Sequence, residues 1–289
     1  MPSLPFSRLS GLPSVIILSS AMLLFSATGC QKENALSGSL DGISTGLISV
    51  SLSWDNKADA GSPVYDVNLS LENDQYSISH TFSSIEEVSK QYLRLPEGDY
   101  ELMVRVNMSE QNGLMTKVMP PTFTQSTYKS LGSVVISVNE SSRISSQAWF
   151  GMTRIYVEKG DISNADIQLQ RLLKVLPVSV DSLPANARMV FSMGSVASDV
   201  NLTSYLTSGD YGVPSQNRFG PLRYDTVTFA RGGKQSMDYY LFPPGLGQDS
   251  SKVSIDLITD TDRYSYKTTI QYMYGGKPDT LRLKFDDLR

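Results

Sequence analysis

Apolar and polar residues alternate along most of this chain. In the first such run, Ile48, Val50, Leu52 and Trp54 are separated by three serines. Successive side chains of a β-strand point to opposite faces, so this pattern is typical of a strand with one buried and one solvated face. The nearest approach to a helix is residues 85–90, one or two turns long. The alternation recurs in residues 67–71, 100–106, 134–138, 155–157, 167–169, 178–180, 189–191, 227–229, 237–241, 253–257, 264–270 and 281–285.

Two stretches of the chain share one design. Residues 93–100 read Leu-Arg-Leu-Pro-Glu-Gly-Asp-Tyr, and residues 241–245 read Leu-Phe-Pro-Pro-Gly. Each is the end of an expected strand, a proline turn, a glycine and a further strand, although such turns also recur by chance in all-β proteins. We expect an all-β fold of two tandem β-sandwich domains, residues 46–170 and 171–289. The chain near Arg171 should pass directly from the first domain into the second.

The chain begins with a sequence typical of a secretory signal. Arg8 precedes an apolar stretch of about 14 residues, shorter than the roughly 20 that span a membrane. The stretch leads to Ala27-Thr28-Gly29-Cys30, which resembles a bacterial lipobox. A disulfide, a metal site or a catalytic thiol would need partners that the sequence does not offer Cys30. We predict that residues 1–29 are removed and that Cys30 is lipidated with more than one acyl chain, as stable attachment requires.

The residues after Cys30 indicate where the lipoprotein is sent. Gln31-Lys32-Glu33-Asn34 resembles the short signal that directs lipoproteins of the Bacteroidota to the outer face of the outer membrane. Residues 34–45 are mostly small, Ser and Gly among them, which is typical of a flexible tether. We predict a lipidated N-terminus and tether over residues 30–45, and an outer-membrane lipoprotein exposed at the cell surface.

Charge and composition argue against some partners. The net charge is −4 and the sequence pI about 5.1, so the chain lacks the basic stripe that nucleic acid or an anionic membrane surface would select. Without residues 1–29 the chain retains 260 of its 289 residues, enough for two domains. Cys30 is the one cysteine, so the core must be stable without disulfides.

The sequence shows no pattern typical of catalysis. It has no nucleophile elbow, no His-Glu-x-x-His, no phosphate-binding glycine loop and no Cys-x-x-Cys. With Cys30 at the membrane, the single histidine, His80, has no thiol to activate, and we interpret it as a structural residue. We predict no catalytic residues, no cofactor and no metal site, and therefore no enzymatic activity.

Two weaker hypotheses concern the C-terminal half. Asp256, Asp260 and Asp262 carry the oxygen ligands that calcium prefers, but we favour an ordinary turn at residues 260–262. Six tyrosines are spaced as a sugar-stacking platform would be, yet tyrosine is favoured in strands and pairs across them, so packing is the preferred interpretation. These tyrosines are Tyr239, Tyr240, Tyr264, Tyr266, Tyr272 and Tyr274.

The lipobox, the two β-domains, segment 93–104 and the crossover 169–175 together resemble the fimbrillin-associated anchor lipoproteins of Bacteroidota, the FimB-like fimbrial anchor subunits. The resemblance covers most of residues 30–289 as a pattern rather than as an invariant motif. It implies two transthyretin-like, Greek-key sandwiches and attachment to the outer membrane through a lipid. It also implies a role at the base of a fimbrial stalk, with stalk subunits as partners.

We therefore expect a lipoprotein that anchors a fimbrial polymer and limits its length. Subunits of such fimbriae resemble incomplete sandwiches that a strand from a neighbour completes. Residues 281–285 suit the last strand of the second domain and only 286–289 follow, so we expect this chain to accept a strand rather than donate one. We expect the accepting groove beside Ile48–Trp54. The alternative is a glycan-binding β-sandwich lipoprotein of a polysaccharide-uptake system.

Overall fold

The computed structural model describes residues 42–73, 75–119, 133–138, 144–197, 199–202, 219–242, 250–271 and 281–285. Most of them lie in strands, which confirms the all-β prediction. The first half of the chain forms β1 Thr45–Trp54, β2 Val67–Glu72, β3 Ser77–Phe82, β4 Tyr92–Pro96, β5 Gly98–Val106, β6 Leu114–Met119, β7 Ser133–Val138, β8 Trp149–Val157 and β9 Ile162–Arg171. The second half forms β10 Lys174–Leu183, β11 Arg188–Ala197, β12 Asp199–Asn201, β13 Phe219–Thr228, β14 Gly233–Leu241, β15 Ser250–Ile258, β16 Arg263–Gln271 and β17 Leu281–Lys284.

Three short helices accompany the strands: η1 Lys57–Gly61, α1 Ile85–Ser89 and η2 Glu110–Asn112. Helix α1 confirms the one helical stretch expected from the sequence. Ser84 caps it by accepting a hydrogen bond from the Glu87 N–H, and Val88 is buried on its inner face.

The first sandwich is one sheet that folds over on itself. Its strand order is β3-β2-β5-β8-β9-β1-β4, and β8 meets β9 through the pairs Trp149–Arg171 and Phe150–Gln170. Buried residues from both sides of that corner form one core, including Leu69 and Leu102 from one layer and Ile48 and Ile167 from the other. The chain thus has a four-strand layer, β3-β2-β5-β8, facing a three-strand layer, β9-β1-β4.

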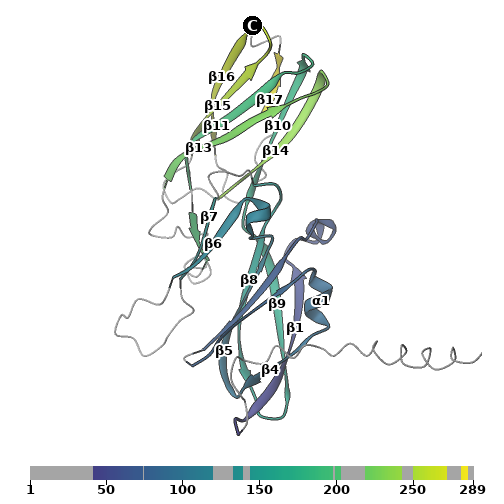
Figure 1. Cartoon of the computed structure of the whole chain (residues 1–289), viewed down its shortest axis with the longest axis vertical. Coiled ribbons are helices and arrows are strands. Elements are labelled where there is room, and N and C mark those ends of the chain that lie inside the picture. The colour runs from purple at the N-terminus through teal and green to yellow at the C-terminus, as the bar shows by residue number, and fades with distance from the viewer. Residues whose placement is uncertain are drawn as a thin grey trace, which may run out of the picture.

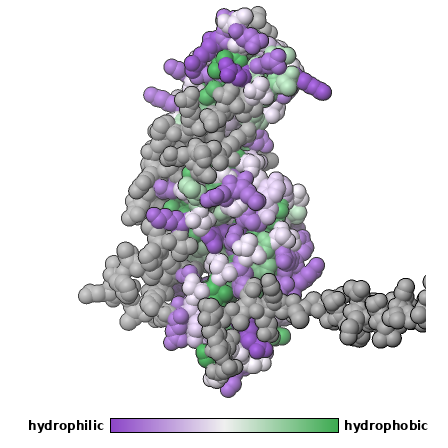
Figure 2. Space-filling model, in the orientation of Figure 1, coloured by the Kyte–Doolittle hydropathy of each residue, from purple (hydrophilic) through white to green (hydrophobic). Residues whose placement is uncertain are grey.

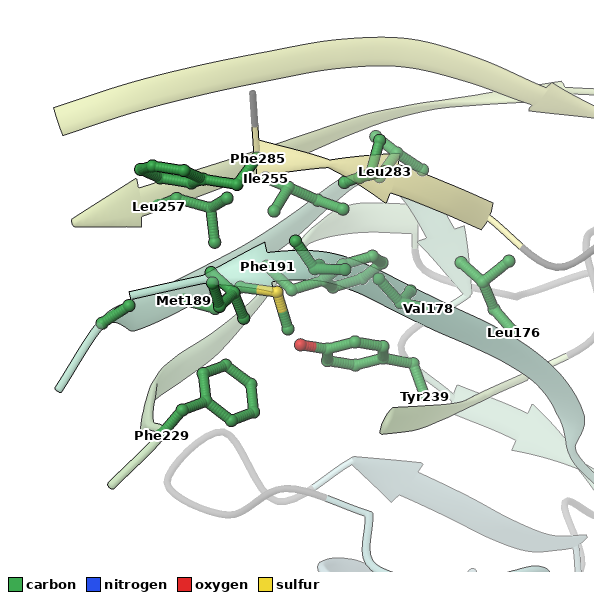
Figure 3. Packing of buried hydrophobic residues seen from close by; sticks show 14 of the residues in the cluster. Leu176, Val178, Met189, Phe191, Phe229, Tyr239, Ile255, Leu257, Leu283 and Phe285 are labelled. Atoms are coloured by element: carbon green, nitrogen blue, oxygen red, sulfur yellow. The ribbon is translucent and has the colours of Figure 1, made fainter. Parts of the chain in front are cut away.

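The second sandwich repeats this design. Its layers are β13-β11-β15-β16 and β14-β10-β17, around the core in Figure 3. Strand β10 runs antiparallel to β14 and parallel to β17, just as β1 runs antiparallel to β4 and parallel to β9. The first proline–glycine segment of the sequence spans the end of β4 and the start of β5. Strand β14, the counterpart of β4, ends at Leu241, where the second segment begins, and residues 243–249 lie outside the described residues.

The sandwiches follow one another along the long axis of the molecule, with β6 and β7 beside their junction (Figure 1). Strand β12, from the second half of the chain, pairs with β7 from the first. A third buried cluster fills this region, with Phe150 of the first sandwich, Leu172 and Leu173 of the crossover, and Phe242 after β14. The crossover from β9 to β10 takes two residues, Leu172 and Leu173.

Candidate functional site

The docking site that the sequence suggested, beside Ile48–Trp54, is contradicted at Ile48 and Ser49, which have a paired strand on both sides, and for Val50–Trp54 it stays a prediction. Strand β1 lies between β9, which pairs with Leu47–Trp54, and β4, which pairs with Thr45–Ser49. Helix α1 packs against the same strand, as Figure 1 shows. The alternation of apolar residues fixes which face of a strand is buried but not which strands flank it, so the sequence could not reveal this pairing.

Free sheet edges are the alternative places for an incoming strand to pair. Among the described residues on the face shown in Figure 2, hydrophobic residues are scattered among hydrophilic ones and do not form a large apolar patch. The edge strands of the described sheets are β3, β4, β6, β12, β13, β14, β16 and β17. Proteins block unwanted pairing at such edges with charged residues and proline.

Strand β3 is the exception among these edges, because it contains no charged residue, no proline and no glycine. Each of the others contains at least one charged residue: Arg94 in β4, Lys117 in β6, Asp199 in β12, Arg223 in β13, Lys234 in β14, Arg263 in β16 and Arg282 in β17. Of the edge strands in the described residues, β3 is therefore the one whose sequence does least to prevent pairing with another chain.

The side chains of β3 alternate along its length, with a buried histidine at the centre. Ile78, His80 and Phe82 face inward, while Ser77, Ser79 and Thr81 are exposed. Burial lowers the pKa of His80, so this residue is neutral at pH 7 and adds no charge to the edge. The prediction that His80 is a structural residue agrees with this position. Sequence reasoning missed β3 itself, since a histidine among Ile78 and Phe82 interrupts the apolar pattern.

A pocket of about 710 Å³ lies at the end of β3. Its walls come from the end of β3 and the turn after it, from α1, from the segment before β2 and from the region of η2. They consist of Tyr65, Asp66, Thr81, Phe82, Ser83, Glu87, Ser109, Glu110 and Gln111. Three of these residues are acidic and none is basic, so the pocket is negatively charged.

Hydrogen bonds hold two of the pocket's carboxylates in place. Asp66 accepts from Asn68 Nδ2 at 3.0 Å and from Ser109 Oγ at 2.5 Å. Glu87 accepts from the backbone N–H and the hydroxyl of Ser83, each at 2.8 Å, and these bonds lower its pKa. Both carboxylates are thus held in place as hydrogen-bond acceptors.

Asn107 fixes the wall that carries Tyr65. It is fully buried, has a φ of 57°, and follows directly after β5. Its Oδ1 accepts from the Tyr65 N–H at 2.7 Å, and its Nδ2 donates to the carbonyls of Pro63 at 2.9 Å and Gln147 at 3.1 Å. One side chain therefore ties together three segments that are far apart in sequence.

The calcium hypothesis is not supported, and the turn interpretation is confirmed. The Thr259 N–H donates to the Asp262 carbonyl at 2.8 Å, which closes a turn over residues 259–262. Asp256 instead accepts from Arg263 Nη2 at 2.6 Å and from the Ser265 hydroxyl. Within the described part of the chain, no group of three or more His, Cys, Asp or Glu side chains is placed to hold a metal.

Of the six tyrosines that the sequence singled out, the four in the described residues pack against buried clusters. Tyr239 is 1% exposed and stacks on Phe191 with ring centroids 3.9 Å apart, as Figure 3 shows. Tyr264 meets Phe285 edge-on at 5.0 Å, and Tyr266 packs against the same core. Tyr240 packs against the cluster at the junction, whereas Tyr272 and Tyr274 lie outside the described residues.

Residues 1–41 also lie outside the described residues, so the predicted lipidation of Cys30 stays a prediction. Among the helices that the structure describes, none is long and apolar enough to cross a bilayer.

Comparison with known proteins supports the fold. No protein-family profile and no curated protein matches the chain. A solved structure of an adhesin candidate from Bacteroides ovatus superposes with a TM-score of 0.52 at 12% identity, over 86% of this chain and 94% of that one. The neighbours also include the fimbrial anchor protein Mfa2 from Porphyromonas gingivalis, with a TM-score of 0.44 at 11% identity, over 77% of this chain and 82% of that one. The first of these likenesses shows the β-sandwich fold, and the predicted resemblance is confirmed at that level.

Proposed function

We propose that this protein anchors a fimbrial polymer at the cell surface and limits its length, by pairing β3 with a strand of the neighbouring subunit. The observation that carries the proposal is the sequence of β3, the one described edge strand without a charge, proline or glycine. In strand addition, main-chain hydrogen bonds supply the affinity and side-chain pockets supply the specificity. A pocket stands at the end of this strand. A subunit fixed to the membrane ends the polymer at that point.

The other parts of the proposal follow from the sequence. Residues 46–170 and 171–289 are the two domains, and Cys30 attaches them to the outer membrane through residues 30–45. The partners are fimbrial stalk subunits, and neither catalysis nor nucleic-acid binding is part of the function. The repeated strand order of the two sandwiches supports the division into domains.

Lipidation is tested by metabolic labelling with a palmitate analogue. The wild-type protein should be labelled, and Cys30→Ser should not. Label that survives this substitution would contradict the lipid anchor.

Strand pairing is tested in a deletion strain that is complemented with variants. The deletion should release fimbriae into the medium or change their length. Ser79→Lys places a charge at the centre of the exposed face of β3 and should fail to restore attached fimbriae. The matched control is Ser236→Lys in β14, an exposed serine on an edge that already carries Lys234 and Asp238. Attached fimbriae of normal length in the deletion strain, with no other anchor present, would refute the anchoring function.

The glycan-binding alternative receives no support from the described tyrosines of the second half. Tyr239 is buried, and Tyr264 and Tyr266 pack against the core of the second sandwich. The described tyrosines do not form an exposed cluster there.

A further inference from the structure

A hollow on the second sandwich lies apart from the pocket at the end of β3. Strands β11, β15 and β16 lie side by side there (Figure 1), and the hollow over them has a volume of about 430 Å³. This volume is within the range of roughly 300–1,000 Å³ that is typical of small-molecule sites. The described lining consists of Ser192, Met193, Gly194, Lys252, Val253, Ser254, Lys267, Thr268 and Thr269.

The strand register places six of the lining residues on the face of the sheet that points away from the core. Residues paired across neighbouring strands share a face, and the core residue Val253 of β15 points the opposite way. The six residues are Ser192 and Gly194 of β11, Lys252 and Ser254 of β15, and Lys267 and Thr269 of β16. They form two rows across the three strands, with one lysine in each row.

The face that carries the hollow is positively charged, although the net charge of the chain is −4. Strands β11, β15 and β16 contain four basic residues and one acidic residue, Asp256, which leaves three positive charges. Asp256 accepts hydrogen bonds from Arg263 and Ser265. Desolvation opposes its ionisation, but these bonds and the charges of Arg263 and Lys267 lower its pKa. The one carboxylate on this face is therefore already engaged.

Lys252 and Lys267 supply the charge inside the hollow. Both are exposed, and neither forms an ion pair with another described residue. Lys252 is paired with Thr269 and Lys267 with Ser254, so the two lysines occupy diagonal positions on neighbouring strands. Long side chains at diagonal positions come within reach of each other, so the two ammonium groups repel unless an anion lies between them.

We infer that this hollow binds an acidic sugar, a carbohydrate unit that carries a carboxylate or a sulfate. The inference goes beyond the proposed anchoring function and does not rest on it. The two ammonium groups would donate charge-assisted hydrogen bonds to the acid group. The hydroxyls of Ser192, Ser254 and Thr269 surround them, and a hydroxyl both donates and accepts, as the hydroxyls of a sugar do.

The sheet favours an acidic sugar over two other classes of ligand. Strands β11 and β15 have a paired strand on each side, so an extended peptide over them finds few free main-chain groups to pair with. The described lining contains no aromatic residue, so a neutral sugar would have neither a charge nor an aromatic ring to hold it. Charge and hydroxyl contacts are what this hollow offers.

Gly194 gives the hollow part of its depth. A methyl carbon added at this position would have its nearest contact, the Lys252 carbonyl oxygen, at 3.8 Å, so a side chain here would project into open space. A larger residue at 194 would therefore occupy the hollow while both lysines keep their charges. This position separates the shape of the site from its charge.

Isothermal titration calorimetry of the full-length protein with defined oligosaccharides tests the inference. The probe is trigalacturonic acid, which has a carboxylate on each sugar unit, and the matched neutral compound is galactotriose. We expect trigalacturonic acid to bind about tenfold more tightly, as two charge-assisted contacts at an exposed site would give. The preference should decrease as salt is raised.

Variants test the charge and the shape of the site in turn. Lys252→Gln and Lys267→Gln should each weaken binding of trigalacturonic acid about fivefold. The control Lys284→Gln removes an exposed lysine of β17, outside the hollow, and should leave binding unchanged. Gly194→Val keeps every charge, fills part of the hollow and should also weaken binding about fivefold. Gly194→Ser, with a smaller side chain, replaces it if circular dichroism shows that valine unfolds the sandwich.

A triglutamate peptide with blocked termini distinguishes a sugar site from a surface that attracts any anion. Equal binding of this peptide and trigalacturonic acid, unaffected by the substitution of Gly194, would overturn the inference. Equal binding of galactotriose, or binding of neither sugar, would overturn it as well. The anchoring function is tested separately, because both lysine variants should restore attached fimbriae in the deletion strain whether or not the hollow binds a sugar.

Discussion

Replacing Asn107 should be among the most destabilising single changes in the first sandwich. Its side chain makes three well-formed hydrogen bonds, to Tyr65, Pro63 and Gln147, and it is fully buried. Each such bond contributes about 1 kcal/mol net, and a buried polar group left without its partner costs more. Asn107 also has a φ of 57°, a conformation that asparagine tolerates better than alanine does.

The expected loss for Asn107→Ala is therefore about 4 kcal/mol: roughly 3 from the hydrogen bonds and about 1 from the backbone. Asn107→Gly removes the same bonds but has no steric penalty at positive φ, so it should cost about 3 kcal/mol. The comparison of the two variants isolates the conformational part.

Urea unfolding followed by tryptophan fluorescence measures both values, because Trp149 is fully buried in the core of this sandwich. Losses below about 1 kcal/mol for both variants would refute the account of Asn107 as the residue that joins the three segments. A glycine variant less stable than the alanine variant would refute the conformational part alone.

Two further predictions concern the same sandwich. Gly46→Ala should destabilise it by about 1–3 kcal/mol in urea unfolding, because the added methyl carbon would lie 2.1 Å from the Glu158 carbonyl oxygen. The control Gly61→Ala, with open space around the added methyl carbon, should leave stability nearly unchanged. Equal stabilities of the two variants would contradict this packing. The free energy of unfolding should fall as pH drops through about 6.5, because burial lowers the pKa of His80 and the unfolded chain therefore takes up the proton first. His80→Gln should flatten the dependence of this free energy on pH between about pH 7 and 5.5. An unchanged dependence would refute the attribution to His80.

Local alternation predicted most of this fold, because it reports which side of each strand faces a core. Ile48 and Val50 are buried where the pattern puts them, and the helical turn at Ile85–Ser89 forms where period two is lost. The pattern failed at β3, where the residue at the buried central position is His80. A strand with a polar side chain at a core position cannot be recognised from the periodicity of apolar residues.

Contacts between distant segments could not be predicted in the same way. Asp59 is 1% exposed, yet the sequence around it reads as an ordinary polar loop. Its burial depends on Trp149 Nε1, which donates to it at 3.0 Å, and on Arg171 Nε, which donates at 2.8 Å. These partners lie 90 and 112 residues away. The candidate site also depends on contacts between distant segments, since its pocket is formed by the segments before β2, after β3 and after β5.

The junction between the sandwiches bears on how an anchor carries load. Leu172 and Leu173 are buried, and Gln147 bonds both the N–H and the carbonyl of Leu173, each at 3.0 Å. With β12 paired to β7 as well, the second sandwich is attached to the first by more than its crossover. Strand β3, the proposed docking edge, and β1, the strand that follows the predicted tether, nevertheless belong to the same sandwich. Tension between a polymer on β3 and the membrane would therefore pass through the ladders and core of the first sandwich, and the second would lie outside that path.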